Sequence, residues 1–125
     1  MNNLIIDAAG DKILFKIITD SKSYTTDYSN NRENFDKLVV LLFNFLAINN
    51  IKINEVNNIF VNQGPGKFSG IRASIAVAKA LSLVNNLTLY GFFNYQVVDK
   101  NYNKIMDLFN KNLLKKNLLK PQYSS

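Results

Sequence analysis

The sequence predicts a single α/β domain built on a mixed sheet, and three observations support this prediction. The chain has 125 residues, 47% of them apolar and 19% charged, which is typical of one globular domain. Short runs rich in β-branched and aromatic residues alternate with two longer apolar segments of helical period. Three strand-like runs come first, and strands then alternate with helices, an order that favours antiparallel pairing followed by parallel crossovers.

The N-terminal part of the chain predicts a three-stranded meander. Residues 3–7 contain a short apolar run that ends at Asp7, and the turn sequence Ala-Ala-Gly-Asp follows. Residues 12–19 are rich in isoleucine, and residues 22–28 combine tyrosine with small polar residues, which is typical of a half-exposed strand near an edge. Polar turn residues separate the three runs, so we expect consecutive antiparallel strands.

The segment 32–49 predicts a helix with more apolar surface than one sheet face can cover. Apolar residues recur along it at helical spacing, namely at Phe35, Leu38, Val39, Leu42, Phe43 and Leu46. Leu41, Phe45 and Ile48 are also apolar but lie off this stripe, so apolar side chains span roughly 260° of the helix. We therefore expect part of this helix to face a partner.

The next elements complete the predicted topology. A strand at 58–62 leads into the loop QGPGKFSG and a helix at 69–85, with Ser69 as the expected N-cap. Alanines recur along this helix, and their small side chains let another helix approach closely. A strand at 88–92 then gives the order βββαβαβ, a five-stranded mixed sheet with both helices on one face. This is the topology of one ribonuclease-H-like subdomain of the actin/hexokinase type.

The composition excludes several classes of chemistry. The chain has no cysteine and no histidine, which removes thiol nucleophiles, thiolate zinc sites, imidazole bases and Ser-His-Asp triads. Nine carboxylates leave little for an all-oxygen metal site. The N-terminus lacks the pattern of a signal peptide, and no apolar run reaches the roughly 18 residues of a membrane span. We expect a cytoplasmic protein with no cofactor, no metal and no membrane contact.

The net charge of +6 is concentrated in the C-terminal segment 99–125. This segment is rich in asparagine and has six lysines against two aspartates, a net charge of +4. Its scattered apolar positions predict a helical tail that follows a first domain of residues 1–98. The lysines raise the hypothesis of a weak RNA contact. They do not line up on one helix face, as a helix lying on a membrane surface would require.

Two weak candidates for ligand binding lie where predicted strands end. The loop with Gly64, Gly66 and Gly70 can present backbone N–H groups to an anion at a helix N-terminus. The alternative, which we favour, is a tight strand-to-helix turn. Asp7 stands where an actin-like ATPase holds phosphate and metal, but only two alanines and a glycine follow it. A structural role in capping turn amides is therefore the favoured interpretation of Asp7.

The run GPGKFSGIR at residues 64–72 resembles the GPGSFTG[VL]R signature of the TsaB (YeaZ) family. Upstream, LIIDAAG is similar to the family's opening strand ILAIDTS, and the resemblance covers about residues 3–98. It implies a non-catalytic subunit of the bacterial machinery that makes N6-threonylcarbamoyladenosine in tRNA. Such a subunit pairs with the catalytic paralogue TsaD and works with the ATPase TsaE, and tRNA is reached through the complex.

The chain departs from the family pattern in two ways. The family's second subdomain is missing, and the ending Pro121-Gln122-Tyr123 is similar to the family's C-terminal ending, so we expect a shortened form with only the N-terminal subdomain. Two alanines replace Thr-Ser after Asp7, and Lys67 replaces a small residue in the glycine loop. Both replacements argue against nucleotide binding by this chain alone.

The resemblance also implies where a partner binds. The family's heterodimer interface is formed by the two N-terminal helices, the same helices whose apolar surface exceeds what one sheet face can cover. The expected interface residues are Leu41, Phe45, Ile48, Arg72, Ala76 and Lys79. A second copy of the chain is the alternative occupant of this surface. A small basic RNA-binding module and a minimal actin-like ATPase are the competing functions.

Overall fold

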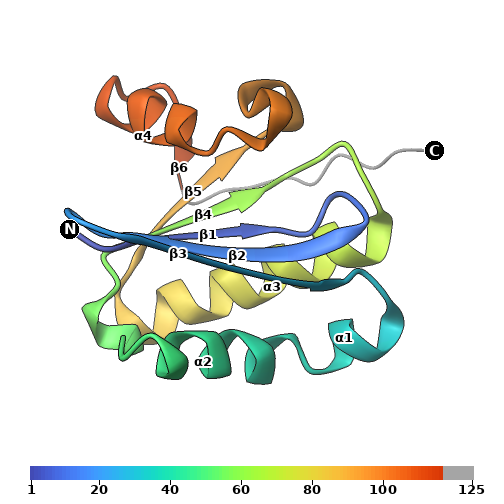
Figure 1. The fold of residues 1–125 in the computed structure, drawn as a ribbon. Coiled ribbons are helices and arrows are strands. Elements are labelled where there is room, and N and C mark those ends of the chain that lie inside the picture. The colour runs from blue at the N-terminus through green and yellow to red at the C-terminus, as the bar shows by residue number, and fades with distance from the viewer. Residues whose placement is uncertain (117–125) are drawn as a thin grey trace.

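The computed structural model describes residues 1–116, and within them a six-stranded mixed sheet forms the centre of the fold (Figure 1). The strand order is β3-β2-β1-β4-β5-β6. β1, β2 and β3 pair antiparallel, β1, β4 and β5 pair parallel, and β6 runs antiparallel to β5. The strands are β1 (Asn3–Asp7), β2 (Lys12–Ile18), β3 (Ser23–Ser29), β4 (Asn58–Asn62), β5 (Thr88–Phe92) and β6 (Lys115–Lys116).

The predicted α/β class and the βββαβαβ order are confirmed, with one strand more than expected. The extra strand, β6, has only two residues and pairs Lys116 with Tyr90 and Lys115 with Gly91. Its two lysines sit in a lysine-rich sequence that carries no strand signal of its own. The pairing forms because the segment before it folds back onto the sheet and brings the chain beside β5.

The helices occupy both faces of the sheet. α2 and α3 lie on one face and α4 lies on the other (Figure 1), and three short 3-10 turns join the elements. The expected placement of both long helices on one face is therefore confirmed. The helices are α1 (Arg32–Asp36), α2 (Leu38–Ile48), α3 (Phe68–Asn85) and α4 (Asn103–Asn110), and the 3-10 turns are Ile53–Glu55, Asn94–Gln96 and Val98–Lys100.

Two helix boundaries differ from the sequence prediction. The helix expected at 32–49 is divided at Lys37, whose φ of −121° and ψ of 26° leave the helical region. The Asn31 side chain caps α1 separately, so five residues form their own short helix beside α3. α3 begins at Phe68 and not after Ser69, because the extended Lys67 is its N-cap and its amide is bonded to the Ala9 carbonyl.

The larger apolar core lies between the sheet and α2 and α3. Alternate residues of β2 point into it, because side chains of a strand alternate between the two faces. Phe15 of β2 contacts Phe45 of α2, with ring centroids 6.1 Å apart. The fully buried members of this core include Leu4, Ile6, Ile13, Phe15, Ile17, Leu42, Ile59, Val61, Ile71 and Ala78.

The segment predicted as a helical tail covers the opposite face of the sheet. Within the described part of this segment, Val98–Lys100 is a 3-10 turn and Asn103–Asn110 is α-helical, so the predicted tail is helical there only in part. Tyr102 and Ile105 are buried against Ile5, Phe60 and Phe92, in a second core. The apolar spacing of this segment therefore serves packing on the sheet. The expected ending at 121–123 lies outside the described residues.

Candidate functional site

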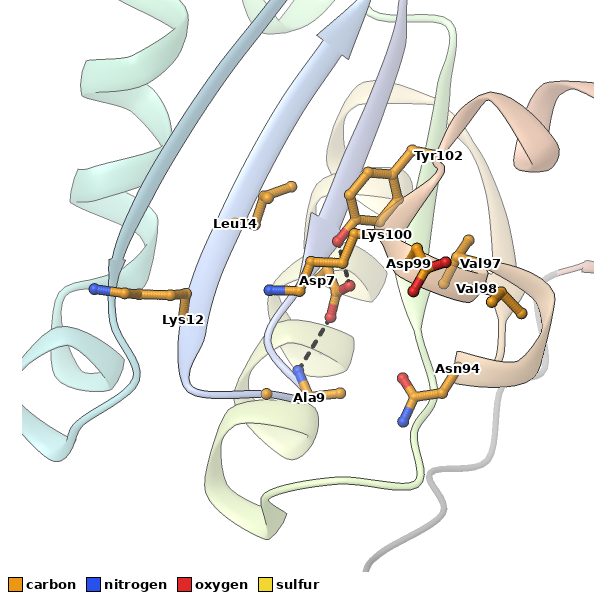
Figure 2. Close-up of a pocket in the computed structure, with 11 residues that line it drawn as sticks. Asp7, Ala9, Lys12, Leu14, Asn94, Val97, Val98, Asp99, Lys100 and Tyr102 are labelled. Atoms are coloured by element: carbon orange, nitrogen blue, oxygen red, sulfur yellow. Dashed lines mark hydrogen bonds between the residues drawn. The ribbon is translucent and has the colours of Figure 1, made fainter.

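Asp7 lies at the carboxyl end of β1, beside β4, and its carboxylate is bonded entirely within the protein. Oδ1 accepts hydrogen bonds from the Ala9 amide at 3.2 Å and from Asn62 Nδ2 at 3.0 Å. Oδ2 accepts one from the Tyr102 hydroxyl at 2.5 Å. Figure 2 shows the bonds to Ala9 and Tyr102 as dashed lines. The capping role expected for Asp7 agrees with the bond to Ala9, whereas the other two partners were not predicted.

Tyr102 is the residue at this position that sequence reasoning missed. It comes from the segment before α4, 95 positions along the chain from Asp7, and its side chain is buried. Burial raises the pKa of the Tyr102 hydroxyl far above its usual range, and the adjacent Asp7 charge and hydrogen bond raise it further. The hydroxyl therefore keeps its proton and donates it to Asp7 in a hydrogen bond. No spacing rule connects two residues so far apart.

A cavity of about 250 Å³ adjoins this bonded pair (Figure 2). Asp7, Asp99, Asn94 and Tyr102 contribute polar groups to its lining, together with Lys12 and Lys100. No group of three or more histidine, cysteine, aspartate or glutamate side chains that could hold a metal ion exists among residues 1–116. Asp7 and Asp99 are the two carboxylates in the lining, and the Asp7 oxygens already accept three hydrogen bonds, which leaves Asp7 little capacity as a general base or metal ligand.

The glycine loop between β4 and α3 is packed against the turn that follows β1. A Cβ at Gly66 would lie 2.3 Å from the Ala9 carbonyl oxygen, and one at Gly70 would lie 2.3 Å from the Ala8 carbonyl oxygen. Gly64 has a φ of 101°, which strongly favours glycine. These glycines are thus explained by close backbone contact and by one left-handed conformation, as the tight-turn interpretation requires.

Several amides of the same loop are already bonded inside the protein. The Gly64 amide donates to Asn62 Oδ1 at 2.7 Å, and the Lys67 amide donates to the Ala9 carbonyl at 3.0 Å. Asn62 also donates to Asn94 Oδ1 at 2.7 Å, and Asn94 donates in turn to the Pro65 carbonyl. The network joins the loop to the C-terminal segment and uses these donors inside the protein.

A second candidate surface is the outer side of α2 and α3. A groove of about 500 Å³ separates the two helices, and its lining is almost entirely apolar. Val39 and Phe43 of α2 are 46% and 38% exposed, and Val84 of α3 is 81% exposed. The groove is lined by Val39, Phe43, Ile53, Ala76, Val77, Ala80, Leu81, Val84 and Asn85.

The structure places the predicted interface residues in different surroundings. Ala76 lines the groove, and Arg72 lies on the exposed side of the same helix one turn before it. Ile48 is 78% exposed but borders a different hollow beside β3, and Leu41 is half-buried against the core. Placing Phe45 on the exposed face was wrong, because its ring is buried on Phe15 with only 3% of its surface exposed.

Lys79 is exposed on α3 and does not line the groove. Apart from Ala76, the residues that line the groove were assigned to the core stripe or were not predicted as interface residues. Their signal was present as the four-residue spacing of Ala76, Ala80 and Val84 on α3 and of Val39 and Phe43 on α2. Two such stripes on adjacent helices define an outer groove only after the helix pair is known.

The sheet order and the helix pair on one face define a ribonuclease-H-like α/β domain. YeaZ from Pseudomonas aeruginosa superimposes with a TM-score of 0.73 at 16% identity, over 84% of this chain and 50% of that one. RuvC of T. thermophilus, solved in complex with a Holliday junction substrate, gives a TM-score of 0.63 at 7% identity over 93% of this chain. Identities this low show the shared fold alone.

The sequence comparisons give the family. The family described as "TsaD: tRNA N6-adenosine threonylcarbamoyltransferase" matches residues 16–98, and the chain belongs to this family. The curated relatives found by sequence are TsaB proteins, which confirms the resemblance found in the sequence.

Two curated relatives carry the name tRNA threonylcarbamoyladenosine biosynthesis protein TsaB. The one from Buchnera aphidicola subsp. Schizaphis graminum (strain Sg) is 26% identical over 76% of this chain and 45% of its own length. The one from Buchnera aphidicola subsp. Baizongia pistaciae (strain Bp) is 42% identical over 50 residues, 40% of this chain and 23% of its own length. The chain thus matches less than half the length of either curated relative.

No helix within the described residues is long and apolar enough to cross a membrane.

Proposed function

We propose that the chain is a non-catalytic subunit in threonylcarbamoyladenosine biosynthesis, and that it pairs with a TsaD-type catalytic subunit through the outer face of α2 and α3. The relatives' names supply the pathway. The observation that carries the pairing is the apolar groove between the two helices, which residues 1–116 leave open to solvent.

The exposed side chains argue for a protein partner at this groove. Val84 of α3 is more than four-fifths exposed, Val39 and Phe43 of α2 are 46% and 38% exposed, and all three line the groove. Burying one such side chain contributes roughly 1.5–3 kcal/mol, so a groove with several of them favours association. Ala76 and Ala80 have small side chains, which let a helix of the partner come close to α3.

The chemistry at Asp7 supports a subunit without catalysis of its own. Its carboxylate accepts three internal hydrogen bonds, and the chain has no histidine or cysteine to supply a general base or thiol. In this proposal the catalytic subunit provides the reaction centre. tRNA and a TsaE-type ATPase join the complex without a catalytic contribution from this chain.

The competing RNA-binding hypothesis has weaker support. The described lysines of the C-terminal segment are spread over the 3-10 turn Val98–Lys100, α4, the turn after it and β6. Lys115 and Lys116 are adjacent in β6, and adjacent strand residues point to opposite faces of a sheet. They do not form one basic stripe, as a backbone-tracking RNA site would need.

The test is the affinity of the full chain for a TsaD-type subunit from the same source. Ala80→Glu places a charge in the groove, and we expect a loss of affinity of at least about tenfold. Leu113→Glu is the matched control, because Leu113 is 59% exposed and lies beyond α4. Both variants should keep the melting temperature of the wild-type monomer.

Reconstituted tRNA threonylcarbamoylation provides the second measurement. With Ala80→Glu, the rate of modification should fall in proportion to the fraction of the TsaD-type subunit that is no longer bound. The rate should recover when the concentration of the variant chain is raised. Equal affinity of the Ala80→Glu and Leu113→Glu variants for the TsaD-type subunit would contradict the assignment of this face. If the wild-type chain self-associates through the groove and does not bind the TsaD-type subunit, the occupant of the groove is a second copy of the chain.

A further inference from the structure

Both arginines of the chain line one groove. The sequence has two arginines and thirteen lysines, so lysine is the usual basic residue of this protein. Arg32 of α1 and Arg72 of α3 nevertheless lie on the same groove of about 610 Å³ between these helices. Phe35 and Phe68 are among the other residues that line it.

Within residues 1–116, neither guanidinium group has an ion-pair partner or a side-chain hydrogen bond. Arg72 lies over the ring of Phe68, with its Cζ 5.6 Å from the ring centroid, a contact that orients the guanidinium. Asp36 also lines the groove but forms no ion pair with either arginine. The two guanidinium groups therefore have free donors for an incoming acceptor.

Unlike the two arginines, two lysines elsewhere in the chain form ion pairs with carboxylates. Lys37 pairs with Glu33 at 3.5 Å, and Lys67 pairs with Asp11 at 3.3 Å, both at exposed positions. A lysine is enough for such pairs, because an ammonium group acts as a point charge. A guanidinium group instead presents a planar set of donors that bonds a carboxylate through two parallel hydrogen bonds.

The arginine groove is continuous with the apolar groove of the proposed function. Ala76 lines both, so the arginines stand at one end of the α2–α3 face. The apolar groove itself has no charged residue in its lining. Apolar contact is not directional, whereas a charge pair at one end of an interface fixes the register and orientation of the partner.

We propose that Arg32 and Arg72 together bind one acidic side chain, an aspartate or glutamate carboxylate, of the TsaD-type partner. This inference rests on the proposed function and adds the group that aligns the two subunits. The carboxylate enters between α1 and α3 and accepts hydrogen bonds from both guanidinium groups. Phe68 holds Arg72 in place for it.

The experiment replaces each arginine by lysine in the full chain and measures affinity for the TsaD-type subunit. Arg32→Lys and Arg72→Lys keep the charge and remove the planar set of donors. We expect each to weaken binding about fivefold and the double variant at least about twentyfold. Lys104→Gln on α4 is the control and should leave the affinity within about twofold, although it removes a full charge.

Charge reversal identifies the acceptor. Arg72→Glu should weaken pairing more than Arg72→Lys does, and an acidic-to-arginine change at one position of the partner should restore it. Lysine variants that bind like wild type, while Ala80→Glu still disrupts pairing, would overturn this inference and leave the proposed function intact. Lysine variants that weaken tRNA binding and leave the protein affinity unchanged would also overturn it, in favour of an RNA phosphate. A wild-type chain that does not bind the TsaD-type subunit would overturn both.

Discussion

The two faces of the sheet are covered in different ways. On one face, α2 and α3 bury a large aliphatic core and also expose apolar side chains on their outer side. On the other face, a single short helix and two 3-10 turns close over a small aromatic cluster. Phe60, Tyr90 and Phe109 meet there with ring centroids 5.1–5.5 Å apart.

The difference shows what each covering does. Two side chains of the C-terminal segment make their contacts within the chain. Tyr102 donates a hydrogen bond to Asp7, and Ile105 is fully buried. The helix pair α2 and α3 covers the apolar face of the sheet, and its outer side carries an apolar groove beside two arginines. An inward helix face stabilises the fold, whereas the outer face of the same helix is free to serve association. Substitutions on the two faces test this division.

The inward face of α2 gives the largest expected effect. Phe45→Asp would bury an unpaired carboxylate against Phe15, and we expect it to lower the free energy of unfolding by more than about 4 kcal/mol. Val40→Asp is the control on the outer face, because Val40 is 57% exposed in the first turn of α2. Its effect should stay within about 0.5 kcal/mol. Urea denaturation of the two variants checks this, and equal loss of stability would contradict the division into two faces.

The covering of the opposite face gives the next effect. Ile105 is fully buried between α4 and the sheet, so Ile105→Ala should cost about 2–4 kcal/mol of unfolding free energy. Leu113→Ala, at a residue 59% exposed, should cost less than about 1 kcal/mol. A value for Ile105→Ala as small as that of Leu113→Ala would mean that α4 does not hold this face in solution.

The bond between Tyr102 and Asp7 gives a smaller effect that depends on pH. Tyr102→Phe removes a hydrogen bond to a charged group, so at pH 7 the variant should lose about 1.5–3 kcal/mol of stability. Tyr102 has a raised pKa in the folded state, caused first by burial and then by Asp7. Above its ordinary pKa of about 10, the unfolded chain loses the proton while the folded chain keeps it.

The sign of the pH effect follows from this difference in proton binding. The Tyr102 contribution is fully present below pH 10 and is lost as the pH rises further, by up to about 1.4 kcal/mol for each pH unit. The stability gap between wild type and Tyr102→Phe should therefore narrow above pH 10. Parallel urea titrations at pH 8 and pH 10.5 measure it. If the stability difference between wild type and Tyr102→Phe is the same at both pH values, the Tyr102 hydroxyl does not keep its proton in the folded state.

Local patterns in the sequence were sufficient for most of the fold. The strands at 3–7, 58–62 and 88–92 have the predicted bounds, since each is a short apolar run between clear turn signals. The break at Lys37 could not be predicted, because the apolar spacing runs through it without interruption. Its cause is tertiary: α1 packs beside the start of α3, and the spacing of residues along one helix does not contain that contact.

The candidate sites were predictable only where neighbours in sequence are neighbours in space. The glycine loop was recognised as a turn from its own residues, and the structure explains Gly66 by contact with Ala9. Tyr102 was missed, because its partner Asp7 lies at the other end of the chain. Phe45 was misplaced, because an apolar residue off the main stripe was taken as exposed. The contact with Phe15, which buries it, joins two different elements.

The smallest expected effect concerns Asp7 in the assembled complex. If this carboxylate is structural, Asp7→Asn should leave the rate of tRNA threonylcarbamoylation within about threefold of wild type, because the amide oxygen can still accept the hydrogen bonds from Ala9 and Asn62 while the amide nitrogen donates to the Tyr102 hydroxyl. The variant should lose some monomer stability, since hydrogen bonds to a neutral amide are weaker than those to a carboxylate. The rate is measured with the TsaD-type subunit in excess, so that a loss of pairing cannot pass for a loss of chemistry. A rate reduced more than about a hundredfold with the complex still formed would give Asp7 a chemical role, and the closed face of the sheet would then have to be counted as part of the reaction centre.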